Sequence, residues 1–404
     1  MREGWNLKTI AETTKIVAGG TPKTKVEEYW GGEIAWITPA DLGKLTTREV
    51  NLTRRTITDE GLQKSSAKLF PAHSVILSSR APIGHLAINT IPMATNQGCR
   101  GIVPSDNLDT IFLFYFLKSN IKLLNELGTG TTFKELSTKA LGSVNIPIPP
   151  LKEQKQIVAL LDQAFTAIDQ AKANIEKNIA NAKELFQSKL NDIFSQKGDG
   201  WKEKTLGELG KVSMCKRILK KQTTPDGEIP FYKIGTFGKE PNAFISKEIY
   251  DDFRTKYSFP KMGDILISAS GTIGRRVIYD GLPAYFQDSN IVWIDNNEEL
   301  VTNEYLYQFY GICDWNPSKG ATISRLYNSD LRRIKISFPC IEEQKLIIPK
   351  MVKLNQHTVQ IQSNYTKKLK DLEELKKSIL QKAFAGELTN QLAVGSNEFA
   401  VNIE

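Results

Sequence analysis

Two stretches of the sequence carry apolar side chains at alternating intervals of four and three residues, with Glu, Lys, Gln and Asn between them. The first stretch covers 151–197 and the second covers 341–389. Apolar residues at this period form a stripe along one side of an α-helix, and their spacing is typical of a coiled-coil seam. We therefore predict two long helices that pack through Leu161, Phe165, Ile168, Ile175, Ile179 and Phe186 in the first and Leu354, Ile361, Tyr365, Leu369, Leu372 and Ile379 in the second.

The length of these helices favours their pairing with each other. About 45 residues at 1.5 Å each give a rod of about 70 Å, which one small domain does not cover. An antiparallel pair buries both stripes and relates the two halves of the chain by a pseudo-two-fold axis. Lys172 and Lys189 occupy two expected seam positions. Pro349 lies near the start of the second helix, where it should kink the helix or delay its start.

The segments that precede the helices follow another pattern. In 1–150 and 198–340, short β-branched and aromatic runs alternate with glycine and proline, which is typical of a mainly β or α+β domain. The predicted fold class is therefore α+β, with two similar globular domains separated by two long helices. We place the domains at 1–150 and 198–340, the helices at 151–197 and 341–389, and a disordered tail at 390–404.

The two halves are copies of one unit. "IPIPPLKEQKQIV" from Ile146 returns as "ISFPCIEEQKLII" from Ile336, and "FPAHSVILSSRAPIG" from Phe70 returns as "FPKMGDILISASGTIG" from Phe259. From Gly84 onward a constant offset of 190 residues relates the copies and pairs Gln97 with Gln287. Such self-similarity indicates a tandem duplication. At the repeated junction, Gln154 and Gln344 are expected to be exposed, where they either cap the helix or touch a partner.

Composition narrows the class of partner. The 53 Lys and Arg against 45 Asp and Glu give a net charge of +8, which favours polyanionic partners. The four cysteines are scattered without a Cys-x-x-Cys pair, so we expect reduced, buried thiols in a cytoplasmic protein rather than a zinc site. No run of eighteen apolar residues and no signal-peptide pattern occur, so membrane insertion is not expected.

A search for catalytic motifs finds none. The sequence lacks the phosphate-binding G-x-x-x-x-G-K-[ST], the zinc motif H-E-x-x-H and the nucleophile motif G-x-S-x-G. It also lacks the Asn/Asp-Pro-Pro-aromatic tetrapeptide of amino-methyltransferases and the paired carboxylates with a lysine that are typical of nucleases. The three histidines lie far apart. We therefore expect no cofactor, no metal and no catalytic residue.

Several motifs carry a family resemblance. "GGTPKT" (19–24), "YWGGEIAWITPADL" (29–42), "LSSRAPIG" (77–84), "TNQGCRGI" (95–102) and "ILQKAFAGELT" (379–389) resemble the specificity subunit of type I restriction-modification enzymes. The resemblance covers nearly the whole chain, including its order of domain, helix, domain and helix. Two departures are Pro349 and the sequence Phe286-Gln287-Asp288, where the first half has Asn96-Gln97-Gly98.

The resemblance implies a function. Each globular part would be a target recognition domain that reads one half of an asymmetric, bipartite site in double-stranded DNA. The helices would set the spacing and dock two methyltransferase subunits, and restriction and translocation subunits would join for cleavage. The specificity subunit itself would be non-catalytic.

DNA readout needs side chains that reach base edges, and positioning needs cations on phosphates. Our candidates in the first domain are Lys23, Lys25, Arg54, Arg55, Arg80, Arg100, Thr131, Thr132 and Lys134. Those in the second are Lys216, Arg217, Lys220, Lys221, Lys239, Arg275, Arg276, Lys319, Ser324 and Arg325. The alternative for any one of them is a solvated surface side chain. Trp36 and Phe231 are expected to pack in the core.

Three other functions remain open at this stage. The chain could serve a modification-only system without a nuclease, or be a coiled-coil adaptor that does not bind DNA. It could also be a detached piece of a single-chain methyltransferase-nuclease, although the missing cofactor motifs speak against that. A steep salt dependence of DNA binding would separate the first hypothesis from the adaptor.

Overall fold

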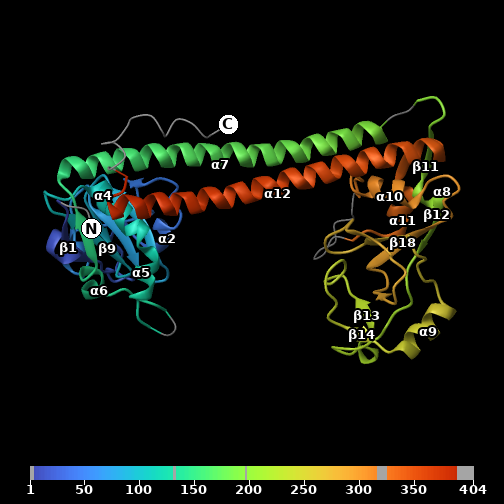
Figure 1. Ribbon diagram of the computed structural model, residues 1–404. Helices are drawn as coiled ribbons and strands as arrows, with labels where there is room; N and C mark the ends of the chain where they lie inside the picture. Colours follow the sequence, from blue (N-terminus) through green and yellow to red (C-terminus); the bar gives the residue numbers. More distant parts are fainter. Residues whose placement is uncertain (1–3, 131–132, 196–197, 316–324, 389–404) are drawn as a thin grey trace. The chain divides into compact units, whose positions relative to one another are not determined.

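The computed structural model describes residues 4–130, 133–195, 198–315 and 325–388 (Figure 1). The chain divides into two compact units, of which unit 1 comprises Met1–Ile175 with Lys367–Glu404 and unit 2 comprises Glu176–Thr366. Each unit combines a globular part with segments of two long helices, α7 (Leu151–Phe194) and α12 (Ile341–Ala385). The predicted tail at 390–404 lies outside the described residues.

The globular part of unit 1 mixes short strands with short helices. In chain order they are β1 (Asn6–Thr9), α1 (Ile10–Thr13), β2 (Thr14–Ala18), η1 (Glu27–Tyr29), β3 (Trp30–Ile37), α2 (Pro39–Leu42), β4 (Glu49–Val50), β5 (Arg55–Ile57), α3 (Asp59–Gln63), β6 (Val75–Ser79), β7 (Ile83–Asn89), β8 (Met93–Thr95), β9 (Cys99–Pro104), α4 (Thr110–Ser119), α5 (Ile121–Glu126), α6 (Thr138–Gly142) and β10 (Asn145–Ile148). The largest sheet has the order β2-β9-β6-β7-β4, a second has the order β5-β3-β8, and β1 pairs with β10.

The globular part of unit 2 repeats this plan. Its elements are β11 (Lys202–Thr205), α8 (Leu206–Leu209), β12 (Gly210–Ser213), η2 (Lys220–Gln222), β13 (Ile229–Tyr232), β14 (Phe244–Ile245), α9 (Lys247–Lys256), β15 (Ile265–Ser268), β16 (Arg276–Ile278), β17 (Tyr285–Phe286), β18 (Ile291–Asn296), α10 (Asn303–Tyr310), α11 (Asn328–Arg333) and β19 (Lys335–Phe338). The sheet orders β12-β18-β15-β16, β14-β13-β17 and β11-β19 match those of unit 1 strand for strand, except that β4 has no counterpart in the described part of unit 2.

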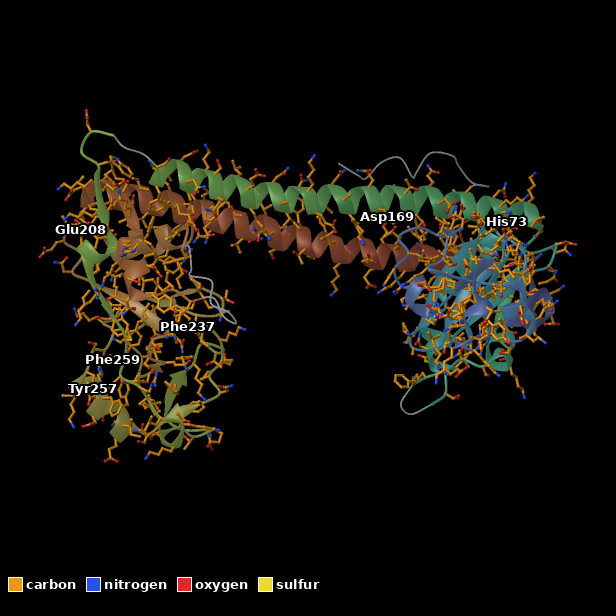
Figure 2. The ribbon with its side chains drawn as sticks, turned by 180° about the vertical axis from the view of Figure 1, so that it is seen from behind. His73, Asp169, Glu208, Phe237, Tyr257 and Phe259 are labelled. Carbon is orange, nitrogen blue, oxygen red and sulfur yellow. The ribbon has the colours of Figure 1, made fainter. Side chains whose placement is uncertain are left out.

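Near its beginning, each copy of the repeat has the same hydrogen-bonded helical turn. The Thr9 backbone N–H donates to Glu12 Oε2 at 2.6 Å, and the Thr205 N–H donates to Glu208 Oε2 at 2.7 Å. Glu208 is labelled in Figure 2. In each case the threonine begins a one-turn helix and the glutamate satisfies an N–H that the helix leaves unpaired. The turn then leads from the first strand of each unit into the edge strand of its larger sheet.

The offset between the copies is not constant, which corrects our expectation of 190 residues throughout. Ser78 pairs with Cys99 in unit 1, and Ser268 pairs with Ile291 in unit 2, so the offset is 190 at the first strand and 192 at the second. The Asn96 N–H donates to the Ile37 carbonyl at 3.1 Å, as the Gln287 N–H does to Tyr232 at 2.9 Å. Asn96, and not Gln97, is therefore the counterpart of Gln287. Extra residues in loops shift the offset without altering the sheet.

The repeated junction contains a buried glutamine in each unit. Gln154 and Gln344 are both 0% exposed, so our expectation of exposed side chains there was wrong. Gln154 accepts the Asp109 N–H at 2.8 Å and donates to the carbonyls of Asn107 and Pro149 at 2.8 and 2.9 Å. Each glutamine thus ties the first turn of a long helix to a loop of the globular part. This contact fixes how each domain joins its helix.

Gln344 makes the equivalent contacts in unit 2. It accepts the Thr302 N–H at 2.9 Å and donates to the carbonyls of Leu300 and Pro339 at 2.8 and 2.9 Å.

The second helix begins at Ile341 and continues through Pro349, so the expected delay in its start is wrong. Pro349 lies on the exposed side of α12, where solvent is available to the carbonyl that the ring leaves without a partner.

The long helices pack on each other and run antiparallel. In unit 1, Lys376 Nζ lies 2.7 Å from Asp169 Oδ1, and Lys172 pairs with Glu373. Asp169 is labelled on α7 in Figure 2. In unit 2, Asn178 Nδ2 donates to the Tyr365 hydroxyl at 3.3 Å. As the residue numbers increase along α7, those of the contacting residues on α12 decrease, so the two helices run antiparallel.

The row of side chains that face the partner helix differs from our prediction at two places. Ile361 is 41% exposed, so its predicted seam packing is wrong, and the neighbouring Gln362 is half-buried in its place. Lys189 is exposed and Leu190 is buried at 1%. The half-buried positions run through Gln362, Tyr365, Leu369, Leu372, Lys376 and Ile379 on α12 and through Ile168, Lys172, Ile175, Ile179, Ala182 and Phe186 on α7, with Ile168 fully buried.

Near each globular part the helices also pack against the domain. Leu161, Phe165 and Ile168 belong to one buried cluster with Phe112 of α4 and with Leu380 of α12. The rings of Tyr115 and Phe165 lie 5.4 Å apart. In unit 2, Leu190, Phe194, Ile348 and Met351 join the core of the globular part, with Phe186 and Ile193 packed against it, and Leu354 is half-buried. Helix and domain thus share one core in each unit.

The cysteines partly differ from expectation. Cys99 and Cys215 are buried, Cys313 is half-buried and Cys340 is exposed, so the prediction of burial is wrong for Cys340. Cys340 directly precedes α12, where the backbone emerges from β19 at the surface of unit 2.

Candidate nucleic-acid interface

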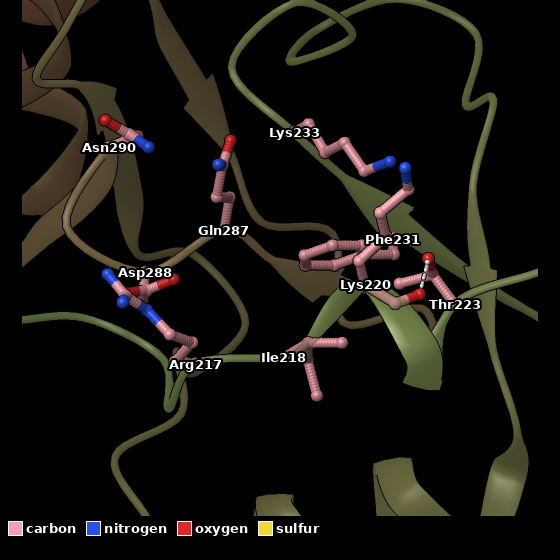
Figure 3. Close-up of a pocket in the computed structure, with 9 residues that line it drawn as sticks. All are labelled: Arg217, Ile218, Lys220, Thr223, Phe231, Lys233, Gln287, Asp288 and Asn290. Atoms are coloured by element: carbon pink, nitrogen blue, oxygen red, sulfur yellow. Dashed lines mark hydrogen bonds and ion pairs between the residues drawn. The ribbon is translucent and has the colours of Figure 1, made fainter.

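A concave site lies in the globular part of unit 2. It is a pocket of about 250 Å³ between η2, β13 and the loop that follows β17 (Figure 3). We call it the basic pocket. The side chains that line it are Arg217, Ile218, Lys220, Thr223, Phe231, Lys233, Gln287, Asp288 and Asn290. Three of these side chains are cationic, namely the predicted Arg217 and Lys220 and the unpredicted Lys233. Gln287 and Asn290 supply two amides, and Asp288 supplies a carboxylate.

The floor of the basic pocket is apolar. Phe231 is 4% exposed and Ile218 is 8% exposed, and both belong to a buried aromatic cluster of unit 2. Phe259, labelled in Figure 2, packs in the same cluster with its ring centroid 6.0 Å from that of Tyr285. This packed cluster supports the segments that carry the polar side chains of the pocket.

The loop that carries Arg217 is fixed from below. Burial raises the pKa of Tyr285, so its hydroxyl stays protonated and donates to the Lys216 carbonyl at 3.0 Å. Burial also raises the pKa of the Cys215 thiol to about 12, so it remains uncharged at neutral pH. Arg217 Nε then lies 2.9 Å from Asp288 Oδ2 across the pocket wall. The structure thereby brings Arg217 beside the loop after β17.

The other predicted cations of unit 2 lie in different settings. Lys216 is exposed with its ammonium 4.9 Å from the Tyr257 ring, which Figure 2 labels, and Lys221 and Lys239 are exposed. Arg275 is half-buried and donates to the Phe237 carbonyl at 2.8 Å, and Arg325 is half-buried and donates to Ser289 at 3.5 Å. Lys319 and Ser324 lie outside the described residues.

Arg276 is half-buried and packs against α10. Its guanidinium lies 4.3 Å from the centroid of the Tyr307 ring, and its Nη1 is buried without a hydrogen-bond partner among the described residues. The DNA contact of Arg276 stays a prediction.

In unit 1 the structure separates exposed from buried candidates. Lys23, Lys25, Arg54, Arg55, Arg80 and Lys134 are exposed. Arg55 places its guanidinium 3.5 Å from the Trp30 ring centroid, and Arg80 Nη1 lies 3.6 Å from Glu135. Lys134 donates to the Asn125 carbonyl at 3.4 Å. Thr131 and Thr132 lie outside the described residues.

Arg100 differs from these exposed candidates, because it is only 7% exposed. It donates to the carbonyls of Gln97 at 2.7 Å and Cys99 at 3.0 Å, and its Nη2 lies 3.4 Å from Glu135 Oε1. These contacts hold the loop between β8 and β9, and the DNA contact of Arg100 stays a prediction. Trp36 and Phe231 are 3% and 4% exposed, as the expected core packing requires.

Sequence reasoning missed Lys233, Gln287 and Asn290 among the residues of the basic pocket. Lys233 directly follows the apolar run of β13, and Gln287 and Asn290 lie in the loop between β17 and β18. Gln287 was noticed as part of the repeat and as part of the departure Phe286-Gln287-Asp288, but not as a possible ligand. The departure itself was the signal, because an inserted loop between matched strands marks a place where the copies differ.

The described residues give no sign of metal or membrane chemistry. No group of three or more His, Cys, Asp or Glu side chains among them is arranged to hold a metal ion. Likewise, none of the helices in the described part of the chain is both long and apolar enough to cross a bilayer.

Comparison with known sequences identifies the family. The profile of the type I restriction modification DNA specificity domain matches residues 2–181 and again residues 198–374. The chain belongs to this family. Its two matched segments correspond to the two copies of the internal repeat, so the chain holds two specificity domains in tandem.

Named relatives of this specificity-domain protein agree with the assignment. A putative type I restriction enzyme specificity subunit of Haemophilus influenzae is 47% identical over 60% of this chain, and the match spans 63% of that relative. The MjaIX specificity subunit of Methanocaldococcus jannaschii is 29% identical over 95% of this chain and 93% of its own.

Solved structures share the fold of the specificity-domain protein. A chain from a study of complex assembly in a type I restriction-modification system matches 96% of this chain and 99% of its own, with a TM-score of 0.77 and 19% identity. The HsdS subunit of Thermoanaerobacter tengcongensis matches 96% of this chain and 98% of its own, with a TM-score of 0.59 and 18% identity. At these identities the likeness establishes the two-domain, two-helix fold.

Proposed function

We propose that this protein is the DNA-specificity subunit of a type I restriction-modification enzyme. The observation that carries the proposal is the tandem pair of specificity domains, 2–181 and 198–374, each of which includes most of a long helix. In this proposal the target recognition domains are 1–150 and 198–340, the spacer helices are 151–197 and 341–389, and the chain performs no catalysis itself.

The two domains should read different half-sites. Thr38 occupies the position in unit 1 that Lys233 occupies in unit 2, one residue beyond the matched strand positions Ile37 and Tyr232. The residue directly after the matched strands β8 and β17 also differs, because unit 1 has Asn96 where unit 2 has Gln287. Side chains of different charge and hydrogen-bonding capacity select different DNA groups, so the complete site should be asymmetric.

The helices give the spacing a physical basis. A helix of 44 residues rises about 66 Å, which is close to two turns of B-DNA at about 34–36 Å per turn. In this proposal the helix length sets the gap between the two half-sites, and the bases within that gap stay unread. Two methyltransferase subunits would dock on the helices, and restriction subunits would complete a cleaving enzyme.

Sequencing of genomic DNA with detection of modified bases tests the proposal. Cells that carry this subunit with its methyltransferase partner are compared with cells that lack only the subunit. We expect a bipartite, asymmetric motif that is methylated only when the subunit is present. An unchanged methylation pattern from an assembled complex would refute the specificity role and favour the adaptor.

A further inference from the structure

The basic pocket offers hydrogen-bond donors almost exclusively. Gln287 Oε1 already accepts the Ile234 N–H at 2.9 Å, and Asn290 Oδ1 already accepts the Ser270 hydroxyl at 2.8 Å. Both amides are therefore left with their NH₂ groups as the part available to a ligand. Lys220 and Lys233 can only donate. A ligand that matches this lining must present acceptors.

The charges in the pocket are unevenly distributed. Asp288 is engaged by Arg217 at 2.9 Å, which neutralises that side of the wall. Lys220 and Lys233 form no ion pair with any carboxylate in the described residues. Figure 3 shows their amino groups on the same side of the pocket, beyond the Phe231 ring. Two ammonium groups that share one end of a pocket repel each other, so an anion between them is stabilised.

The shape of the site decides which DNA group fits. In a duplex the phosphates protrude from the surface, whereas base edges are recessed in the grooves and are read by side chains that project into them. A concave site with a Phe231 and Ile218 floor receives a protruding group and does not reach into a groove. The chemistry and the shape both select a phosphate.

We propose that the basic pocket of unit 2 binds a backbone phosphate of the DNA half-site, held between Lys220 and Lys233 and further hydrogen-bonded by the NH₂ groups of Gln287 and Asn290. This rests on the proposed function and adds to it the place where the second domain is anchored on its half-site. Thr38 stands at the position of Lys233 in unit 1, so the first domain lacks this lysine and must anchor differently.

The experiment measures binding of the full-length subunit, assembled with its methyltransferase partner, to a duplex that contains the methylated motif. The variant K220A/K233A is compared with wild type over a series of salt concentrations. We expect Kd to rise about tenfold and the slope of log K against log salt to lose about one phosphate's contribution, close to 0.9. The methylated motif should stay the same, because phosphate contacts carry no sequence information.

The matched control is K202A/K211A, which removes the same charge from exposed lysines of β11 and β12 outside the pocket. It should leave the salt slope at the wild-type value. K220R/K233R keeps both charges and should retain most of the affinity. Melting temperatures within about 2 °C of wild type show that each variant is folded.

Three results would overturn the phosphate site. In the first, the salt slope and the affinity of K220A/K233A match those of the control. In the second, the variant changes one base of the methylated motif while the slope stays the same, which would mean that the pocket reads a base. The third is a loss of the thermal stabilisation that inorganic phosphate gives wild type, without any change in DNA binding, which would assign the pocket to a free anion. If wild type itself directs no motif-specific methylation, the proposed function fails instead, independently of the variants.

Discussion

Gln344 is completely buried and accepts the backbone N–H of Thr302 at 2.9 Å, so a residue in the first turn of α12 is joined to the start of α10. The same side chain donates to Leu300 and Pro339. Replacing it with alanine would leave one donor and two acceptors buried and unpaired. Together with the shared apolar core, this relationship holds the second domain on its helix.

We expect Gln344→Ala to lower the free energy of unfolding of unit 2 by about 3 kcal/mol, since each unpaired buried group costs about 1–3 kcal/mol and the loop relaxes in part. Urea unfolding measures the loss, and hydrogen exchange of the Thr302 amide locates it. Lys345→Ala, at the exposed neighbouring position, should change stability by less than about 0.5 kcal/mol. Equal losses in both variants would contradict the role of the glutamine.

The ion pair between Asp169 and Lys376 should contribute to helix pairing in unit 1. Lys376 is also 5.0 Å from the Phe165 ring centroid and its side chain is only 18% exposed. Lys376→Glu should destabilise unit 1, and Asp169→Lys in the same chain should restore part of the loss. A double-mutant cycle should give a coupling of about 0.5–1 kcal/mol that shrinks at high salt. Lys377→Glu, whose lysine pairs only with Glu374 on the same helix, is the matched control.

The pair of Lys172 and Glu373 predicts a pH dependence. The hydrogen bond from Lys172 lowers the pKa of Glu373 below its usual 4.5. A carboxylate with a lowered pKa in the folded state adds stability above its unfolded pKa and loses it as the pH falls through the folded value. Melting temperatures should therefore differ between wild type and Glu373→Gln near neutral pH and converge as the pH falls below 4.5 through the lowered pKa of Glu373. Lys172→Ala should remove the same acid-dependent difference, and its persistence there would contradict the assignment.

Arg100 and Arg55 should behave oppositely when replaced by alanine. Arg100→Ala removes the donors that hold the carbonyls of Gln97 and Cys99, so it should cost about 2–3 kcal/mol of unfolding free energy and leave the salt slope of DNA binding unchanged. Arg55→Ala should cost less than about 1 kcal/mol, since this exposed side chain loses only its contacts with the Trp30 and Trp36 rings, while the salt slope falls. If both variants alter the slope equally, the distinction between buried and exposed arginine is wrong.

Exchange of the first domain should alter one half of the motif. We expect that replacing residues 1–150 with the corresponding domain of another family member changes one half-site and preserves the other, as well as the gap between them. Methylation sequencing of cells with the chimaera checks this. A change in both half-sites would show that the domains do not read DNA independently.

The sequence predicted the helices and the repeat because both depend on local periodicity. It failed at Ile361, since a four-three pattern in a polar helix does not decide whether Ile361 or Gln362 faces the partner when both positions border the stripe. Nor could it separate Arg100 from Arg55. Arg100 packs beside Glu135, which is distant in the sequence, so local patterns do not predict its burial. Lys233 was not predicted as a binding residue because it directly follows the apolar strand β13.

The anchoring of Gln154 has a consequence for how such chains diversify. All of its hydrogen-bond partners are backbone atoms, those of Asp109, Asn107 and Pro149. A socket built from main-chain groups accepts almost any side chains at those positions, provided that the loop keeps its path. A globular part of different sequence therefore fits the same helix, provided that its loops present the same main-chain groups to Gln154.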